Sequence, residues 1–476
     1  MDGERIIFHV DVNSAFLSWS AVKRLQDDPG AVDLRTIPSA VGGDVETRHG
    51  IITAKSIPAK CYGIVTGEPV VKALQKCPGL VLVSSDWEAY RAYSNAFIRI
   101  LLEYSELVQQ ASIDEAYVDM TEAVETAVRR TPTDADGGDG IAAAAGTAER
   151  TDVKRATYVP TGAADNAAAR AAGAEERAHA AERRRVAVTL AASLREEIRT
   201  QLGFTVNVGI SSNKLLAKMA SDFQKPDRTH TLWPEEVSAK MWPLPIGDLY
   251  GCGGKTASRL AGIGITTIGD AADAEPSMLQ SFLGEKSGAY ITAASRGIGS
   301  DCVHTEHEDA RSYSNETTTS EDITLQSYDR LTPPLLHHLS ERVAGRMQRD
   351  GVYGSTVTVS VKTNDFRRRS RQKKLDAATN DAAVIEQHAK ELLRGLLYER
   401  DGIFDRGAGV RLIGVGMSSL DHGEYRQLSL EDFLQDQEQE KAETARKDRQ
   451  EKLQKMLQKV QSRYGSGSLR KGNELL

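Results

Sequence analysis

The sequence predicts an α+β chain with several domains, and three observations lead to this expectation. The chain has 476 residues, which is too long for one core at ~100–200 residues per domain. Apolar, β-branched runs that are typical of strands alternate with longer segments whose apolar residues recur at helical spacing. Glycine-rich or polar stretches separate these groups and indicate domain boundaries.

Composition excludes several classes of protein. A hydrophobic share of 40% with a charged share of 27% is typical of folded globular chains. No apolar run reaches the ~18 residues that a membrane span needs. The start Met-Asp-Gly-Glu lacks the basic residues of a secretory signal. We therefore expect no membrane association.

The cysteines indicate a reducing compartment. The chain has four of them, scattered without a CxxC pair: Cys61, Cys77, Cys252 and Cys302. Neither a disulfide framework nor a structural zinc site is expected, and the cytoplasm is the expected location.

The overall charge argues against a protein that coats nucleic acid. Lys and Arg number 60 against 67 Asp and Glu, so the formal net charge is −7. An average over a long chain hides local patches, so this inference has to be tested segment by segment.

The N-terminal part predicts short strands and helices that end in acidic residues. An apolar run at 5–10 indicates a buried strand that ends on Asp11, and a helix is expected to begin at Ala15. The other elements expected before residue 122 are strands near 37–41 and 50–54, a turn at Pro58, a helix over 87–108, and two strands within 111–120 joined by a tight tip at Asp114 and Glu115.

Residues 122–184 interrupt this pattern. They are rich in Ala, Gly, Asp and Arg and contain almost no large apolar side chains. Such a segment cannot bury enough surface to offset the entropy of ordering it, so we expect a low-complexity insertion, helical only near 178–185. Regular structure is expected to resume as a helix over 186–202 and a strand over 204–210.

The C-terminal half predicts two further folded modules. A glycine-rich stretch at 249–270 indicates a helix-hairpin-helix, and a polar linker is expected near 300–315. The last elements expected are helices over 331–349 and 382–398, a strand over 356–361 in a domain ending near 420, and, after 425, a short motif with a charged helical tail.

Three carboxylates stand where predicted strands end: Asp11, Asp114 and Glu115. Adjacent acids repel one another, and their burial is costly unless cations neutralise them. Carboxylate oxygens suit Mg²⁺, and a pair of such ions ~3.5–4 Å apart catalyses phosphoryl transfer. Solvated acids at an exposed turn are the alternative for an isolated Asp-Glu pair.

Cations are placed where phosphates could meet them. Lys60 and Lys225 could reach a triphosphate, although lone loop lysines are usually only solvated. In the stretch Gly251-Cys252-Gly253-Gly254-Lys255, the glycines allow backbone N–H groups to approach a phosphate. The spacing of a nucleotide-binding P-loop is absent, and a plain tight turn is the alternative.

A dense basic run follows a predicted strand in the last domain. It includes Arg367, Arg368, Arg369 and Arg371, and places six cations in the eight positions 367–374. Salt-dependent contact with phosphates is the natural use of such a run, and a solvated loop is the alternative.

Taken in order, these motifs resemble the Y-family (translesion) DNA polymerases, in particular the bacterial DNA polymerase IV type. The matching stretches are Phe8-His9-Val10-Asp11, Ala111-Ser112-Ile113-Asp114-Glu115-Ala116-Tyr117-Val118-Asp119, the segment 208–222 with Lys225-Pro226 behind it, the helix-hairpin-helix, and the segment 409–415. The resemblance extends from about residue 5 to 420, apart from the insertion.

The resemblance implies a right-hand architecture. The expected parts are a palm at 1–13 and 86–240 with the insertion 122–184, fingers at 14–85, a thumb with a helix-hairpin-helix at 241–300, a linker at 301–315, a little-finger domain at 316–425, and a clamp-binding motif with a charged tail at 426–476.

The resemblance also implies roles for single residues. Asp11, Asp114 and Glu115, with the backbone carbonyl of Val12, would hold two Mg²⁺ ions as the catalytic centre. Phe16 falls at the steric-gate position, which selects dNTPs over rNTPs. The triphosphate would contact the amides of Ala15 and Phe16, the side chains of Lys60 and Lys225, and Thr53. The family pattern usually ends in Thr where this chain has Ala54, so the hydroxyl contact to the triphosphate is left open. DNA would meet Gly251, Gly253, Lys255, Arg367, Arg368, Arg369 and Arg371.

The chain departs from the family pattern in the fingers. Ile57 stands where a triphosphate-contacting Tyr is usual, and Lys60 replaces a common Arg, which removes a bidentate phosphate donor. Asn13 stands where many members have Asp. These differences leave the choice between a polymerase IV and a polymerase V type open.

Near the C-terminus, Gln427, Leu430 and Phe433 form a QxxLxxF pattern that looks like a sliding-clamp-binding peptide. We therefore expect a monomeric, template-directed, error-prone polymerase that binds primer-template DNA, dNTPs and the clamp. No second acidic cluster typical of an exonuclease is visible, so proofreading is not expected. The alternatives are a non-catalytic DNA-binding adaptor tethered to the clamp, and a nucleotidyl cyclase with a palm-like sheet.

Overall fold

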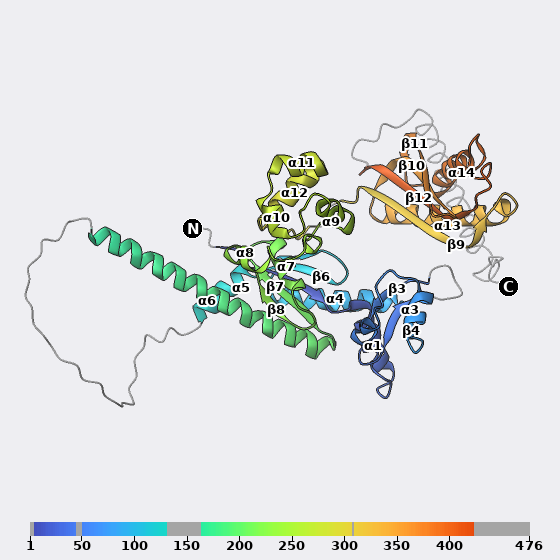
Figure 1. Cartoon of the computed structure of the whole chain (residues 1–476). Helices are drawn as coiled ribbons and strands as arrows, with labels where there is room; N and C mark the ends of the chain where they lie inside the picture. Colours follow the sequence, from blue (N-terminus) through green and yellow to red (C-terminus); the bar gives the residue numbers. More distant parts are fainter. Residues whose placement is uncertain (1–3, 44–49, 131–162, 307–308, 423–476) are drawn as a thin grey trace, which may run out of the picture. The chain divides into compact units, whose positions relative to one another are not determined.

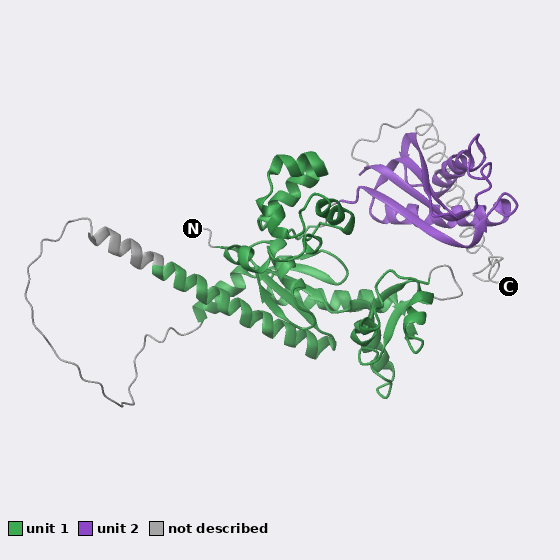
Figure 2. Ribbon diagram, viewed as in Figure 1, with its two compact units in different colours: residues 1–308 green, residues 309–476 purple. Residues whose placement is uncertain are grey.

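The computed structural model describes residues 4–43, 50–130, 163–306 and 309–422. These residues form two compact units, one up to residue 308 and one from residue 309 (Figure 2). Each unit has its own hydrophobic core.

The first unit is built around a five-stranded sheet in the order β5-β6-β1-β7-β8. Figure 1 labels β6, β7 and β8 of this sheet. The central strand β1 (Ile7–Val12) runs antiparallel to both of its neighbours, β6 (Glu115–Asp119) and β7 (Val206–Ser211). The edge strands are β5 (Val108–Gln110) and β8 (Thr229–Thr231).

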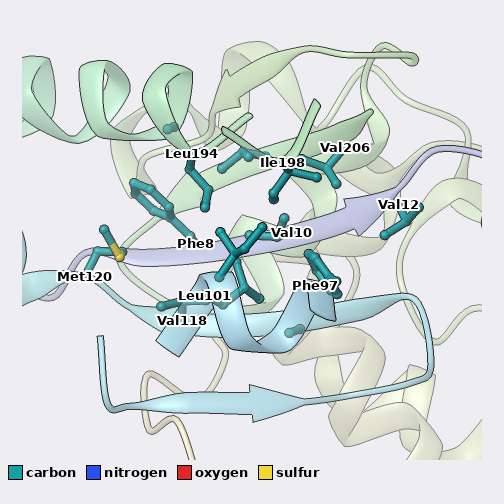
Figure 3. Close-up of a cluster of buried hydrophobic side chains, with 14 of the residues drawn as sticks. Phe8, Val10, Val12, Phe97, Leu101, Val118, Met120, Leu194, Ile198 and Val206 are labelled. Carbon is teal, nitrogen blue, oxygen red and sulfur yellow. The ribbon is translucent and has the colours of Figure 1, made fainter. Parts of the chain in front are cut away.

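The two faces of β1 serve different partners because successive side chains point to opposite sides of a strand. Phe8 and Val10 pack into the main core with α4 (Trp87–Tyr104) and α6 (Ala163–Leu202) (Figure 3). Ile7 and His9 face α7 (Lys214–Asp222) on the other side, where Ile7 clusters with Ala217.

Two predictions for the first unit differ from the structure. The helix predicted to residue 108 ends at Tyr104, because Ser105 is extended and Val108 already begins β5. Pro58 lies in a short helix, α2 (Ile57–Cys61), and not merely in a turn, because Ser56 caps this helix and a proline fits its first turn.

A small sheet in the order β3-β2-β4 follows β1 in the chain. Its strands are β2 (Ser39–Gly42), β3 (Ile52–Lys55) and β4 (Val81–Val83), and its associated helices are α1 (Ala15–Asp27) and α3 (Val70–Lys76).

A helical region follows β8. Gly251 has a φ of 84° and lies against Tyr290, so a Cβ there would come within 2.6 Å of the ring. The elements are η1 (Pro234–Glu236), α8 (Val237–Lys240), η2 (Ile246–Asp248), α9 (Gly254–Ala261), α10 (Ile268–Asp273), α11 (Pro276–Leu283) and α12 (Glu285–Ser295).

The second unit is a four-stranded antiparallel sheet in the order β11-β10-β12-β9, packed on two helices. The elements are β9 (Ser312–Ile323), α13 (Tyr328–Arg349), β10 (Tyr353–Thr363), β11 (Arg368–Thr379), α14 (Ala382–Tyr398) and β12 (Val410–Asp421).

The polar linker expected at 301–315 is shorter than predicted, because β9 already begins at Ser312. This strand is polar and lies at the edge of the sheet, paired with β12 alone. A half-exposed edge strand lacks the apolar run by which a buried strand is recognised in a sequence.

The insertion predicted at 122–184 was wrong at both ends. Residues 121–130 form α5 (Thr121–Arg130), with Val124 buried in the main core, and α6 already runs from residue 163. Arg183 is only 4% exposed and forms an ion pair with Glu125 at 2.6 Å. A buried charged residue is invisible to an argument from apolar composition, which is why this packing was missed.

Across the part of the chain that the structure describes, no helix has the length and apolar character needed to span a bilayer.

Replacing Arg183 with Met should destabilise the first unit by about 3 kcal/mol, because it leaves Glu125 without its buried partner. It also removes the donor to the Glu4 carbonyl, at 2.7 Å. All four tryptophans lie in this unit, so urea unfolding of the full chain followed by their fluorescence measures the change.

The control for this measurement is Arg185→Met. Arg185 is exposed and pairs only with Glu182 on the same helix, so its loss should change the free energy of unfolding by less than about 0.5 kcal/mol. Equal effects of the two variants would contradict the structural role of Arg183.

Candidate active site

The three predicted carboxylates meet at one end of the sheet. β1 and β6 are neighbours, and their register places Asp11 directly opposite Glu115. The Val12 amide donates to the Asp114 carbonyl at 2.9 Å, which ties the acidic tip to the end of β1. Residues more than a hundred positions apart in the sequence therefore form one acidic cluster.

Two lysines neutralise this cluster. The Lys218 ammonium lies 2.6 Å from Glu115 Oε2 and 3.6 Å from Asp11 Oδ2. The Lys225 ammonium lies 2.8 Å from Asp11 Oδ1 and 2.9 Å from Asp222 Oδ1. Burial alone would lower the pKa of each ammonium, but the hydrogen bonds and charges of these carboxylates raise both pKa values.

Glu115 stays ionised because of what surrounds it. His9 Nε2 lies 3.3 Å from Glu115 Oε2. This contact, opposed by burial and reinforced by Lys218, lowers the pKa of Glu115 to about 2. Burial lowers the pKa of His9, although the hydrogen bond to Glu115 opposes this shift.

Asp114 has a different environment. Its Oδ1 accepts a hydrogen bond of 2.6 Å from the Ser112 hydroxyl. Burial raises the pKa of its carboxyl despite this bond, and the charges of Asp11 and Glu115 raise it further. Asp114 is thus more easily protonated than its neighbour Glu115.

The donor set suits a hard divalent cation. Within the described ranges, no three His, Cys, Asp or Glu side chains already converge into a finished metal site. Asp11 and Glu115 are instead turned toward Lys218 and Lys225. Mg²⁺ prefers oxygen ligands, and the negative charge of these carboxylates attracts cations. The residues therefore fit this ion.

A cavity of about 530 Å³ adjoins the cluster. It brings together most of the residues predicted to bind the nucleotide, and it adds Arg35 and Lys55, which the sequence argument missed. Predicted residues in its lining are Asp11, Val12, Ala15, Phe16, Thr53, Lys60, Asp114 and Lys225.

Lys55 had no distinguishing motif, because it is one of many lysines in the sequence. On β3 its ammonium donates to Thr66 at 3.2 Å. Burial lowers the pKa of Lys55, and the nearby charge of Lys60 lowers it further. Two cations that repel each other this way favour an anionic ligand between them.

Phe16 is held in place by aromatic neighbours. Its ring stacks on Tyr90 with centroids 5.0 Å apart and meets Trp87 edge-on at 5.4 Å. The Tyr90 hydroxyl in turn hydrogen-bonds Ser20 at 2.8 Å. Ala15 and Phe16 begin α1, whose first turn has no side-chain cap.

Thr53 does not present a free hydroxyl to the cavity. Its hydroxyl donates to the Val41 carbonyl at 3.1 Å, across the strand pair β2–β3. The hydroxyl contact left open from the sequence is therefore already taken by the backbone.

The predicted DNA-contacting residues of the helical region lie together on a turn and the helix start that follows. Gly253 immediately precedes α9, and Lys255 is exposed in the first turn of that helix. Tyr290 donates to the Tyr250 carbonyl at 2.7 Å, next to the left-handed Gly251.

The arginines of the basic run do not share one face. Arg369 and Arg371 are register partners of the buried Val361 and Val359, so they lie on the helix side of the sheet. There Arg371 donates to both carboxylate oxygens of Glu399, at 2.7 and 2.6 Å. Arg368 lies on the opposite face, paired with Glu316, and Arg367 pairs with Asp365 in the preceding turn.

The clamp-binding residues predicted at Gln427, Leu430 and Phe433 lie outside the described residues.

Comparison with known proteins covers nearly the whole chain. Residues 10–222 match the impB/mucB/samB family, residues 310–430 match the C-terminal domain of this family, and residues 234–265 match the IMS family HHH motif. The match to the HHH motif begins at residue 234, ahead of the glycine-rich stretch predicted at 249–270, and overlaps that stretch at 249–265.

Full-length relatives agree with these matches. The chain is 33% identical to a DNA polymerase IV of Clostridium acetobutylicum, covering 97% of this chain and 96% of that one. It is 29% identical to DNA polymerase IV 1 of Bacillus subtilis, covering 99% and 93%. A solved Y-family DNA polymerase chimera has the same fold, with a TM-score of 0.65 at 23% identity over 87% of this chain and 98% of the other.

The predicted α+β polymerase fold is thereby confirmed, and the chain belongs to the impB/mucB/samB family as a Y-family DNA polymerase of the polymerase IV type.

Proposed function

We propose that this chain adds dNTPs to a primer 3′-hydroxyl opposite damaged templates, by two-metal phosphoryl transfer without proofreading. One observation supports this most strongly. The acidic cluster of Asp11, Asp114 and Glu115 borders a cavity that is also lined by Phe16, Lys60 and Lys225. A non-catalytic adaptor has no need for that combination.

Asp11, Asp114 and Glu115, with the carbonyl of Val12, would hold two Mg²⁺ ions. When bound, such ions supply Lewis-acid chemistry that activates the attacking hydroxyl and stabilises the leaving pyrophosphate. The protein orients the ligands: β1 and β6 fix Asp11 against Glu115, and the bond from Val12 fixes the tip at Asp114.

The triphosphate is bound by groups that converge from separate elements. The uncapped amides at the start of α1 favour anions, as helix N-termini do. Lys60 and Lys225 supply charge, and Lys55 and Arg35 add to it from the same cavity lining. Lys55 thus compensates for the triphosphate contacts that are lost because Ile57 replaces the usual Tyr and Lys60 replaces the usual Arg.

DNA is held without regard to sequence. The turn at Gly251 and Gly253, with Lys255, presents backbone amides and a charge to the phosphates. In the second unit the open face of β11 carries Lys374 and Arg368, the latter paired with Glu316, while Arg369 and Arg371 are engaged on the helix side. Gly414 and Gly416 pair with β9 on that same face and keep it flat.

The chain acts in the cytoplasm and reaches the replication fork through the clamp. The supporting observation is the QxxLxxF pattern at Gln427, Leu430 and Phe433, which follows the last folded domain. Short apolar peptides of this kind bind preformed pockets on a partner.

Asp114→Asn should reduce primer extension about 10²- to 10³-fold, because it removes a negative charge that would hold the Mg²⁺ ions. Extension of a primed template with Mg²⁺ and four dNTPs measures the effect. Asp248→Asn, at an exposed site in η2, is the control and should extend like the wild type. Full activity of Asp114→Asn would remove the basis of the proposal.

Phe16→Ala should raise the incorporation of ribonucleotides relative to deoxyribonucleotides by about 10- to 200-fold, since the ring no longer meets the 2′-hydroxyl. The ratio of kcat/KM for rCTP and dCTP opposite the same template base measures this. Tyr93→Ala removes an aromatic side chain of α4 that stacks on Trp19 instead, and it should leave the ratio unchanged. An unaltered ratio in Phe16→Ala would show that another residue excludes the ribose.

Replacing Gln427, Leu430 and Phe433 together with Ala should abolish stimulation by a loaded sliding clamp while clamp-independent extension persists. Processivity on a circular primed template, with and without clamp and loader, separates the two activities. The matched control replaces Glu431, Asp432 and Gln435 with Ala, which removes polar residues of the same segment. Continued clamp stimulation of the first variant would refute the assignment of the motif.

A further inference from the structure

Lys218 is a buried cation to which the proposed reaction gives no task. It is 9% exposed, in the middle of α7. Its ammonium lies 2.6 Å from Glu115, 3.6 Å from Asp11 and 3.7 Å from Asp222. The first two of these acids belong to the catalytic set, and the third is more exposed and lies outside it.

The packing of α7 against the sheet limits the positions that the Lys218 ammonium can reach. α7 packs so closely on β7 that a Cβ on Gly209 would come within 2.0 Å of the Ala217 carbonyl oxygen. Ser221 donates to the Lys218 carbonyl at 2.8 Å, and its Oγ lies 2.8 Å from His9 Nδ1. The helix therefore cannot slide along the sheet, and only the flexible end of the lysine side chain can change partners.

We propose that Lys218 is a resident counter-cation that holds Asp11 and Glu115 together until divalent ions arrive, and then moves onto Asp222. This inference rests on the proposed function, because it concerns the same carboxylates. Asp222 lies four residues ahead on the same helix, where i,i+4 side chains meet. Lys218 is thus a positioning residue that competes with the metal for its ligands.

Lys214 lies on the same helix as Lys218 but has different partners. Its ammonium donates to Gln109 at 3.1 Å and lies over the Tyr117 ring. Lys214→Met removes one positive charge from α7, as Lys218→Met does, but leaves the acidic cluster as it is. The pair of variants separates competition at the ligands from a general change in charge.

Binding of Mn²⁺ to the full chain without DNA, measured by electron paramagnetic resonance, tests the proposal independently of activity. Lys218→Met should bind Mn²⁺ at least about tenfold more tightly than Lys214→Met, because a unit charge in contact with the ligands is removed. Its unfolding temperature should fall without metal and rise more steeply with added Mn²⁺. Equal or weaker Mn²⁺ binding by Lys218→Met would overturn the proposal.

A second variant keeps the test decisive if Lys218→Met does not fold. Asp222→Asn removes the acceptor to which Lys218 moves, and it should weaken Mn²⁺ binding several-fold relative to Asp248→Asn. Binding equal to that of the control would overturn the exchange. If the wild-type chain neither binds Mn²⁺ nor extends primers, the proposed function fails; if it does both and the variants match their controls, only the role of Lys218 fails.

Discussion

Mutual repulsion among Asp11, Asp114 and Glu115 constrains the rest of the first unit. The pairing of β1 with β6 brings these acids together at one end of the sheet, where partial burial would be unfavourable without cations. Lys218 and Lys225 approach them from α7 and the segment that follows it. The position of α7 against the sheet is therefore as much a requirement of the site as the acids themselves.

Strand β1 contributes to both the hydrophobic core and the acidic cluster, because its two faces carry different side chains. Phe8 and Val10 are buried among α4 and α6, and His9 and Asp11 face the site and α7. Any shift of register by one residue would exchange these faces and move Phe8 and Val10 to the side of the site and α7. The hydrophobic core thus determines where the Asp11 carboxylate lies.

Charge is distributed so that an acidic chain can still bind DNA. The net charge of −7 includes acids that are engaged within the protein, such as Glu399 with Arg371 and Glu391 with Lys373. These pairs occupy the helix side of β11 and leave Arg368 and Lys374 on the open face. Strand alternation, and not the number of arginines, decides which cations lie on the open face.

The sequence by itself determined the fold class, the order of the motifs and the acids Asp11, Asp114 and Glu115, because these depend on local patterns and spacing. It could not reveal the burial of Arg183 or the strand β9, since these are stabilised by distant partners and not by their own apolar content. The positions of Lys55 beside the cavity and of Lys218 against the acids were likewise hidden. A lysine acquires such surroundings only from the charges that the tertiary fold brings within a few ångströms, and no spacing along the chain encodes that distance.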